Sequence, residues 1–190
     1  MNRDDLKGKT YAEVSELFDK ELEEYKNKVA EVMDQETLDK MEAEVNDEYT
    51  EVNNYLTDVT YDLPGGVDFD GKHYSKNDVA QQIVYFLNKN EVEWSYTLGL
   101  FELAKLWKNK DFAKISYYTF DSTLRTLNQI KFKGFDEWKN ILVVNEYMKQ
   151  CHDEYTKDTA MLLFVSQKHN AILDRMQLIQ KVEPVNETNE

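Results

Sequence analysis

The chain has 190 residues, which is enough for one hydrophobic core with a small appendage. Six glycines and two prolines provide few turn signals, a composition that favours long helices and argues against a β-sandwich or barrel. The formal net charge of −14 argues against direct contact with nucleic acids or anionic membranes, because their phosphates attract clustered Lys and Arg.

Two helices are predicted in the first 58 residues. Thr10 and Glu13 form a capping box that begins the first helix. Apolar residues then recur every three or four positions, at Tyr11, Val14, Phe18, Leu22, Tyr25, Val29 and Val32. After a polar break, a second such stripe comprises Leu38, Met41, Val45, Tyr49, Val52 and Leu56. Narrow stripes with a period near 3.5 are typical of coiled-coil seams, so residues 1–58 are predicted to form an antiparallel helical hairpin, the arm.

A small β-hairpin is predicted near residues 59–75, as the only sheet of the protein. Residues 59–63 (VTYDL) are strand-like, and the Pro-Gly-Gly sequence at 64–66 marks a turn. Asp70-Gly71 is a two-residue hairpin signal with alternating residues on both sides.

Helices are predicted again after the hairpin. Ser75 and Asp78 form a second capping box, which begins a helix that ends near residue 88. The next helix, from about 91 to 108, has a wide apolar surface and is predicted to be central to the core. Its apolar residues are Trp94, Leu98, Phe101, Leu103, Leu106 and Trp107. Residues 111–133 are predicted to be helical, although 114–120 (KISYYTF) are also typical of a strand.

The pattern from residue 136 to about 181 is helical, and the polar sequence at 156–158 (TKD) is predicted to divide it into two helices. The predicted fold class is therefore all-α, mainly a helical bundle with an N-terminal antiparallel helical hairpin and a small β-hairpin near 59–75. Three parts are expected: the acidic, coiled-coil-like arm at 1–58, an aromatic-rich helical bundle at 59–182, and a disordered tail at 183–190.

The charge is concentrated in the arm. Residues 1–58 contain 18 acidic and 7 basic side chains, whereas residues 59–190 contain 19 and 16. One interpretation is a solvated helical surface, and another is a docking site for a protein with a basic or neutral surface. An acidic mimic of nucleic acid is a third. The candidate partner-binding residues are Glu21, Glu24, Glu31, Glu44, Asp47, Glu48 and Glu51.

Signals for catalysis or metal binding are weak. The adjacent His152-Asp153 pair resembles the pair in metal-dependent HD phosphohydrolases, which also need an upstream histidine and a downstream aspartate. Here His73 and Asp158 or Asp174 would have to serve. A metal-dependent hydrolase that uses His152 and Asp153 is thus an alternative hypothesis, and no cofactor or metal site is predicted.

Several isolated residues are predicted to be structural. Cys151 is the sole cysteine, which excludes a disulfide and a cysteine zinc site, and it is expected to be a buried apolar residue. Arg125 and Arg175 could each form an internal carboxylate pair, a structural role that is favoured over substrate binding. His169 lies within the last predicted helix.

The function predicted from these features is that of a non-enzymatic protein–protein interaction protein or a structural or assembly protein. Lysine outnumbers arginine 20 to 3, a usage typical of AT-rich genomes, and we interpret the chain as a phage or mobile-element accessory protein or a virion component. With no secretory signal and no long apolar run, an intracellular protein without membrane contact is expected. A homo-oligomer is also compatible. The arm is predicted to project and carry the main contact, and residues 59–182, with 16 acidic and 16 basic side chains, to stay folded without it.

Overall fold

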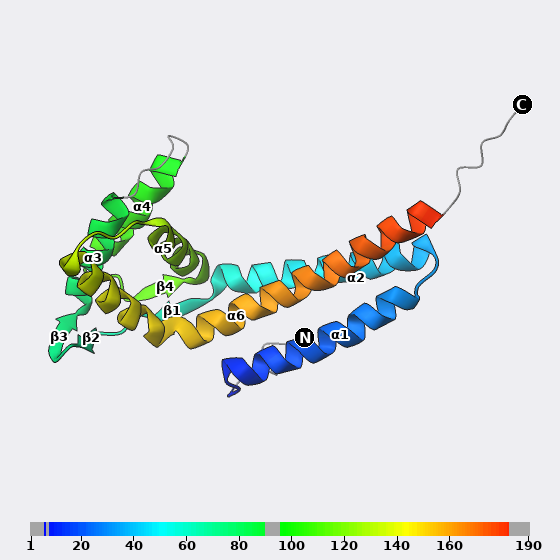
Figure 1. Ribbon diagram of the computed structural model, residues 1–190, viewed down its shortest axis with the longest axis horizontal. Helices are drawn as coiled ribbons and strands as arrows, with labels where there is room; N and C mark the ends of the chain where they lie inside the picture. Colours follow the sequence, from blue (N-terminus) through cyan, green and yellow to red (C-terminus); the bar gives the residue numbers. More distant parts are fainter. Residues whose placement is uncertain (1–5, 7, 90–95, 183–190) are drawn as a thin grey trace, which may run out of the picture. The chain divides into compact units, whose positions relative to one another are not determined.

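The computed structural model describes residues 6, 8–89 and 96–182 (Figure 1). The chain separates into two compact units. We refer to residues 1–55 together with 156–190 as the helical unit, and to residues 56–155 as the mixed unit. The predicted class, mainly α with an N-terminal helical hairpin and a small β-hairpin, is confirmed.

The helical unit contains α1 (Tyr11–Glu31), most of α2 (Gln35–Asp58) and the second half of α6 (Phe135–Val182). The predicted capping box begins α1, because the Glu13 carboxylate accepts the Thr10 N–H at 2.7 Å while the Thr10 hydroxyl accepts the Glu13 N–H at 3.4 Å. α1 and α2 run antiparallel, and the second half of α6 lies beside them (Figure 1). The buried positions of the two predicted stripes in this unit are Val14, Phe18, Leu22, Val29, Leu38, Met41, Val45 and Val52.

The second half of α6 completes this core. Phe164 of α6 stacks on Phe18 of α1 with ring centroids 4.8 Å apart, and Val165 and Ile172 are also buried. Arg175 closes the far end of α1, since its Nε donates to the Val32 carbonyl at 2.9 Å. The apolar seam of the arm is therefore filled from within the chain.

An ion pair crosses the helical unit near this aromatic stack. Lys168 of α6 binds Glu48 of α2, with side chains only 14% and 21% exposed. The same ammonium lies 4.8 Å from the centre of the Tyr25 ring and 5.4 Å from that of Phe164. A partly buried charge is thus surrounded by a carboxylate and two aromatic faces.

Two small sheets belong to the mixed unit. The predicted hairpin is confirmed as β2 (Gly66–Phe69) and β3 (Lys72–Ser75), joined by Asp70 and Gly71, which have φ of 52° and 71°. The prediction that it is the only sheet is wrong. β1 (Thr60–Asp62) pairs antiparallel with β4 (Lys114–Ser116), with Tyr61 opposite Ile115. Both of these side chains are buried, so a strand that is remote in sequence completes the pair.

The described part of the mixed unit also contains the helices α3 (Lys76–Asn88), α4 (Thr97–Lys108), α5 (Tyr117–Gln129) and the first half of α6. The helix predicted over 111–133 thus begins only at Tyr117, after β4, with the Ser116 hydroxyl accepting the Thr119 N–H. Buried side chains form the core, among them Val79, Ile83, Phe86, Leu87, Phe120, Val143, Val144 and Tyr147.

The predicted break in α6 at 156–158 is wrong, because the helix continues through it. Lys157 and Asp158 are buried rather than solvated in a loop. Lys157 Nζ donates to the Lys9 carbonyl at 3.2 Å, and the Tyr55 hydroxyl donates to Asp158 at 3.1 Å. Their polarity is satisfied inside the helical unit. The compact units divide the chain at 55/56 and 155/156, whereas the predicted division lay at 58/59; the predicted tail at 183–190 lies outside the described residues.

Candidate functional site

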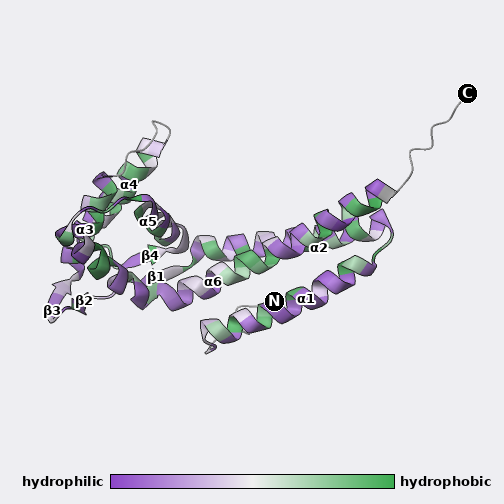
Figure 2. Ribbon diagram, in the orientation of Figure 1, coloured by the Kyte–Doolittle hydropathy of each residue, from purple (hydrophilic) through white to green (hydrophobic). Residues whose placement is uncertain are grey.

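The central position predicted for the helix at 91–108 is wrong. Among the described residues of this region, α4 buries only Ala104 and Trp107. Leu98 is 72% exposed and Phe101 is 62% exposed. Apolar residues recur along α4, visible as green segments in Figure 2, yet few of their side chains are buried. Trp94, assigned to the same helix from the sequence, lies outside the described residues.

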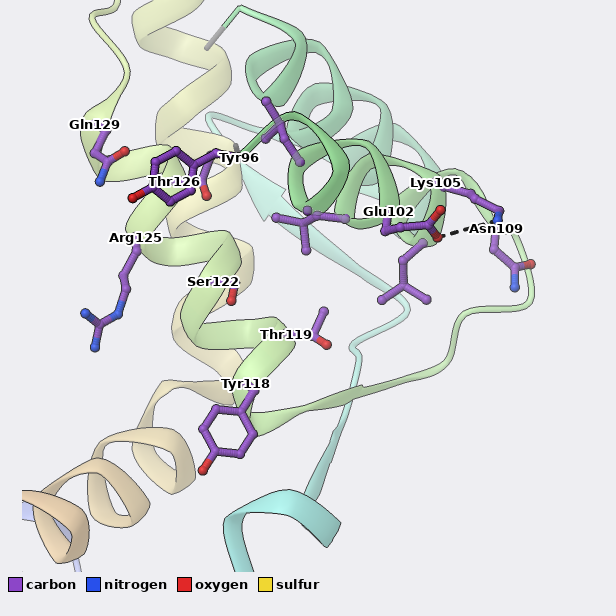
Figure 3. A pocket seen from close by; sticks show the side chains of 14 residues that line it. Tyr96, Glu102, Lys105, Asn109, Tyr118, Thr119, Ser122, Arg125, Thr126 and Gln129 are labelled. Carbon is purple, nitrogen blue, oxygen red and sulfur yellow. Dashed lines mark hydrogen bonds and ion pairs between the residues drawn. The ribbon is translucent and has the colours of Figure 1, made fainter. Parts of the chain in front are cut away.

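A groove of about 1320 Å³ separates α4 from α5 (Figure 3). From α4 it is lined by Leu100, Leu103 and Leu106, all half-buried. From α5 it is lined by Thr119, Ser122 and Thr126. Charged side chains stand at its margins, where Lys105 lies 3.5 Å from Glu102 and Arg125 lies 2.7 Å from Asp121.

This arrangement fits the docking of a helix. Apolar leucines line one wall, hydroxyls line the other, and charges stand at the edges, as in grooves that bind the apolar face of an amphipathic helix. α4 has 12 residues, which gives a contact length of about 18 Å, or three helical turns. The hydroxyls on α5 leave room for polar contacts that fix the register of a bound helix.

A second exposed apolar stripe begins α6. Phe135, Trp138 and Leu142 are 73%, 55% and 50% exposed and follow one another at steps of three and four residues. Beside it, Glu137 accepts hydrogen bonds from Lys89 at 2.5 Å, the Lys133 N–H at 2.8 Å and the Tyr85 hydroxyl at 3.0 Å.

These bonds hold the Glu137 carboxylate in its charged form. The hydrogen bond from Lys89, followed by that from the Lys133 backbone, lowers the pKa of Glu137 to about 2. The Glu137 carboxylate therefore links the end of α3 to the start of α6 by hydrogen bonds, next to the exposed apolar stripe.

The acidic candidates occupy different environments. Exposed side chains are Glu24, Glu31, Glu44, Asp47 and Glu51. Glu21 is half-buried, and Glu48 is engaged by Lys168. Burial, with smaller effects of Glu44 and Glu48, raises the pKa of Tyr25 to about 12. Since the apolar seam is filled, the arm presents mainly charge, and its role in partner binding stays a prediction.

His152 and Asp153 are both exposed on α6. His73, the upstream histidine that a metal-dependent hydrolase would require, lies 2.7 Å from Asp68 within the β-hairpin. Within residues 6, 8–89 and 96–182, no three His, Cys, Asp or Glu side chains lie together as metal ligands would. The hydrolase therefore remains a hypothesis without a described site.

The other singled-out residues have structural contacts. The expected carboxylate pair of Arg125 is formed with Asp121, whereas that of Arg175 is wrong, because Arg175 binds a backbone carbonyl at the end of α1. Cys151 is buried as predicted, and burial raises the pKa of its thiol. His169 Nε2 lies 3.2 Å from Glu42 on α2.

Comparisons with models of known protein families, with curated proteins and with solved structures find no match to this chain. None of the described helices has the length and apolar content needed to cross a membrane. The candidate site therefore stands on its own geometry. This site was not predicted from the sequence, because the apolar surface of α4 was assigned to the core. The signal available in the sequence was a short helix with apolar residues on all sides, Gly99 among them.

Proposed function

We propose that the chain is a protein–protein interaction or assembly protein that binds a helical segment of another protein molecule along α4. The observation that carries this proposal is the exposure of Leu98 and Phe101 on a helix that also borders an open, leucine-lined groove. Monomeric proteins seldom leave large contiguous apolar surfaces in water, and such surfaces are typical of binding sites.

The expected affinity contribution can be estimated from burial. Removing a large apolar side chain from water contributes about 1.5–3 kcal/mol when it starts fully exposed. Because 72% of Leu98 and 62% of Phe101 are exposed, burial in a complex would contribute about 1–2 kcal/mol for each. Each residue would then change the dissociation constant by roughly tenfold.

The acidic arm is a weaker basis for this function. Its seam is filled by α6, and exposed carboxylates alone contribute little affinity and are screened by salt. The apolar part of a contact along α4 should instead persist when salt is raised, because burial of apolar surface is not screened, whereas any charge pairs at its edges should weaken.

Capture from an extract of cells that produce the protein tests the proposal. The tagged full chain is compared with the double variant Leu98→Ser/Phe101→Ser, and captured proteins are identified by mass spectrometry. The matched control is Phe135→Ser/Leu142→Ser, which removes two similarly exposed side chains from α6. We expect the α4 variant to lose the captured protein and the control to retain it. Retention by the α4 variant, or loss in the control alone, contradicts the assignment to α4.

A further inference from the structure

We infer that the helical segment bound along α4 belongs to the acidic helical unit of a second copy of this chain, so that copies associate head to tail. This inference rests on the proposed function and names its partner. It is carried by the juxtaposition of exposed apolar residues, the α4–α5 groove and local positive charge on one part of the mixed unit, and by the opposite charge of the helical unit.

The segment that forms the groove carries positive charge. Residues 97–133, which include α4, β4 and α5, contain seven basic and three acidic side chains. This segment is therefore positive within a chain whose net charge is −14. Lys105, Lys108 and Lys110 are exposed at the end of α4, and Arg125 is exposed on α5. A partner helix along this surface should carry carboxylates.

Such carboxylates are abundant in the helical unit. The sequence of the helical unit contains 22 acidic and 11 basic side chains, so most of the negative charge of the protein lies there. On α2, Glu44, Asp47 and Glu51 are exposed and follow one another at steps of three and four residues, which places them on one face of the helix. They span about 10 Å along the helix axis.

The charges favour a head-to-tail contact over a contact between like surfaces. Two acidic arms would repel each other side by side, and two positive groove surfaces would do the same. A head-to-tail contact instead opposes the carboxylates of α2 in one copy to the lysines of α4 in the next. The two surfaces lie on different parts of each chain, so the contact is heterologous and can continue from copy to copy.

Sedimentation velocity of the full chain in about 0.1 M salt, where the Debye length is about 10 Å, tests the inference. Two double variants each remove one side of the contact: Lys105→Glu/Lys108→Glu on α4 and Glu44→Lys/Glu51→Lys on α2. A matched control, Lys72→Glu/Lys149→Glu, makes the same charge change at exposed positions of the mixed unit that do not line the groove.

We expect concentration-dependent association of the natural chain and of the control. The α4 double variant alone and the α2 double variant alone should each associate at least about tenfold more weakly than the natural chain, because two charge pairs become repulsive. An equimolar mixture of the two variants should restore association, because the reversed charges on α4 of one variant oppose the reversed charges on α2 of the other, and their natural surfaces also match. Association of the natural chain should also weaken toward 1 M salt.

Three results would overturn the inference. A natural chain that stays monomeric at all concentrations excludes self-association, and if capture of a different protein still depends on Leu98 and Phe101, the proposed function stands with another partner. Loss of association in the α4 variant without rescue by mixing indicates a two-fold contact of α4 with itself. An equal loss in the control shows that net charge, rather than either surface, governs association.

Discussion

The replacement Phe164→Ala tests whether the second half of α6 belongs to the core of the helical unit. Phe164 is 5% exposed and stacks on Phe18, also 5% exposed, with ring planes 14° apart. Removing a buried Phe side chain typically costs about 3–5 kcal/mol, including the cavity left behind. The neighbouring Leu163 is 55% exposed, so Leu163→Ala should cost about 1 kcal/mol or less.

Urea denaturation provides the measurement. A loss of 3–4 kcal/mol corresponds to a shift of the midpoint on the order of 1–2 M urea. All three tryptophans, at 94, 107 and 138, lie in the mixed unit, so fluorescence follows that unit while far-UV circular dichroism follows both. We expect Phe164→Ala to shift the circular dichroism transition strongly and Leu163→Ala to leave it nearly unchanged.

A double-mutant cycle that combines Phe164→Ala with Phe18→Ala tests the stacking of the two rings directly. If the two rings stack as described, the double variant should lose about 0.5–1.5 kcal/mol less than the sum of the single variants. Equal effects of Phe164→Ala and Leu163→Ala would refute the described face of α6, and additive effects of the two phenylalanine variants would refute the stack.

Three further predictions follow from the contacts. Lys168→Met removes the ammonium beside the partly buried Glu48 and should lower the free energy of unfolding by about 2 kcal/mol. Adding Glu48→Gln should recover part of this loss. A double variant whose loss equals the sum of the losses of the two single variants would contradict the ion pair between Lys168 and Glu48. Glu137→Gln should destabilise the protein at pH 7. A carboxyl whose pKa is lowered from 4.5 to about 2 stabilises the fold above pH 4.5 and loses this effect as the pH falls toward 2. The difference in urea midpoint between the variant and the natural chain should therefore shrink at pH 3, and a difference independent of pH would exclude this cause. Deleting residues 1–58 should expose Phe164, Val165 and Ile172 and cause the second half of α6 to unfold or aggregate, in contrast to the prediction that 59–182 stays folded. Circular dichroism would detect the loss of helix, and binding of a hydrophobic dye would detect the exposed apolar surface. A monomeric truncated protein with all of α6 intact would disprove this prediction.

Local chemistry explains what could be predicted from the sequence. The capping boxes at Thr10 and Ser75 and the Asp70-Gly71 turn each depend on residues within three or four positions of one another. The stripes of α1 and α2 were equally readable, because helical periodicity alone determines which side chains share a face.

Long-range contacts explain what could not be predicted. The strand at 114–116 forms because Ile115 meets Tyr61, more than 50 residues earlier in the chain. The helix continues through Lys157 and Asp158 because their hydrogen-bond partners are Lys9 and Tyr55. A window of sequence around these residues shows only β propensity or polarity, and tertiary partners decide how each is used.

The candidate site was missed for a related reason. Apolar residues on α4 are compatible with a buried helix or with an exposed binding surface, and the sequence does not say which neighbours cover them. The functional prediction consequently went to the arm, where the charge is conspicuous. The structure fills the apolar seam of the arm and leaves α4 uncovered, which moves the proposed contact to the mixed unit.

A substitution at Gly99 tests whether a partner binds along α4. It lies in the first turn of α4 and lines the groove, and a Cβ added there would meet no atom within 4 Å. Nothing within the described fold therefore requires glycine, although glycine in a helix costs up to about 1 kcal/mol relative to alanine. Close approach of a bound helix would require it. Gly99→Ala should raise the melting temperature by about 2–4 °C and at the same time weaken association severalfold, because the added methyl group occupies the space of the partner. The matched control is Gly65→Ala, which also adds a methyl group in open space within the mixed unit and should leave association unchanged. If Gly99→Ala stabilises the chain and binding is unaffected, no partner approaches the groove side of α4 at this turn.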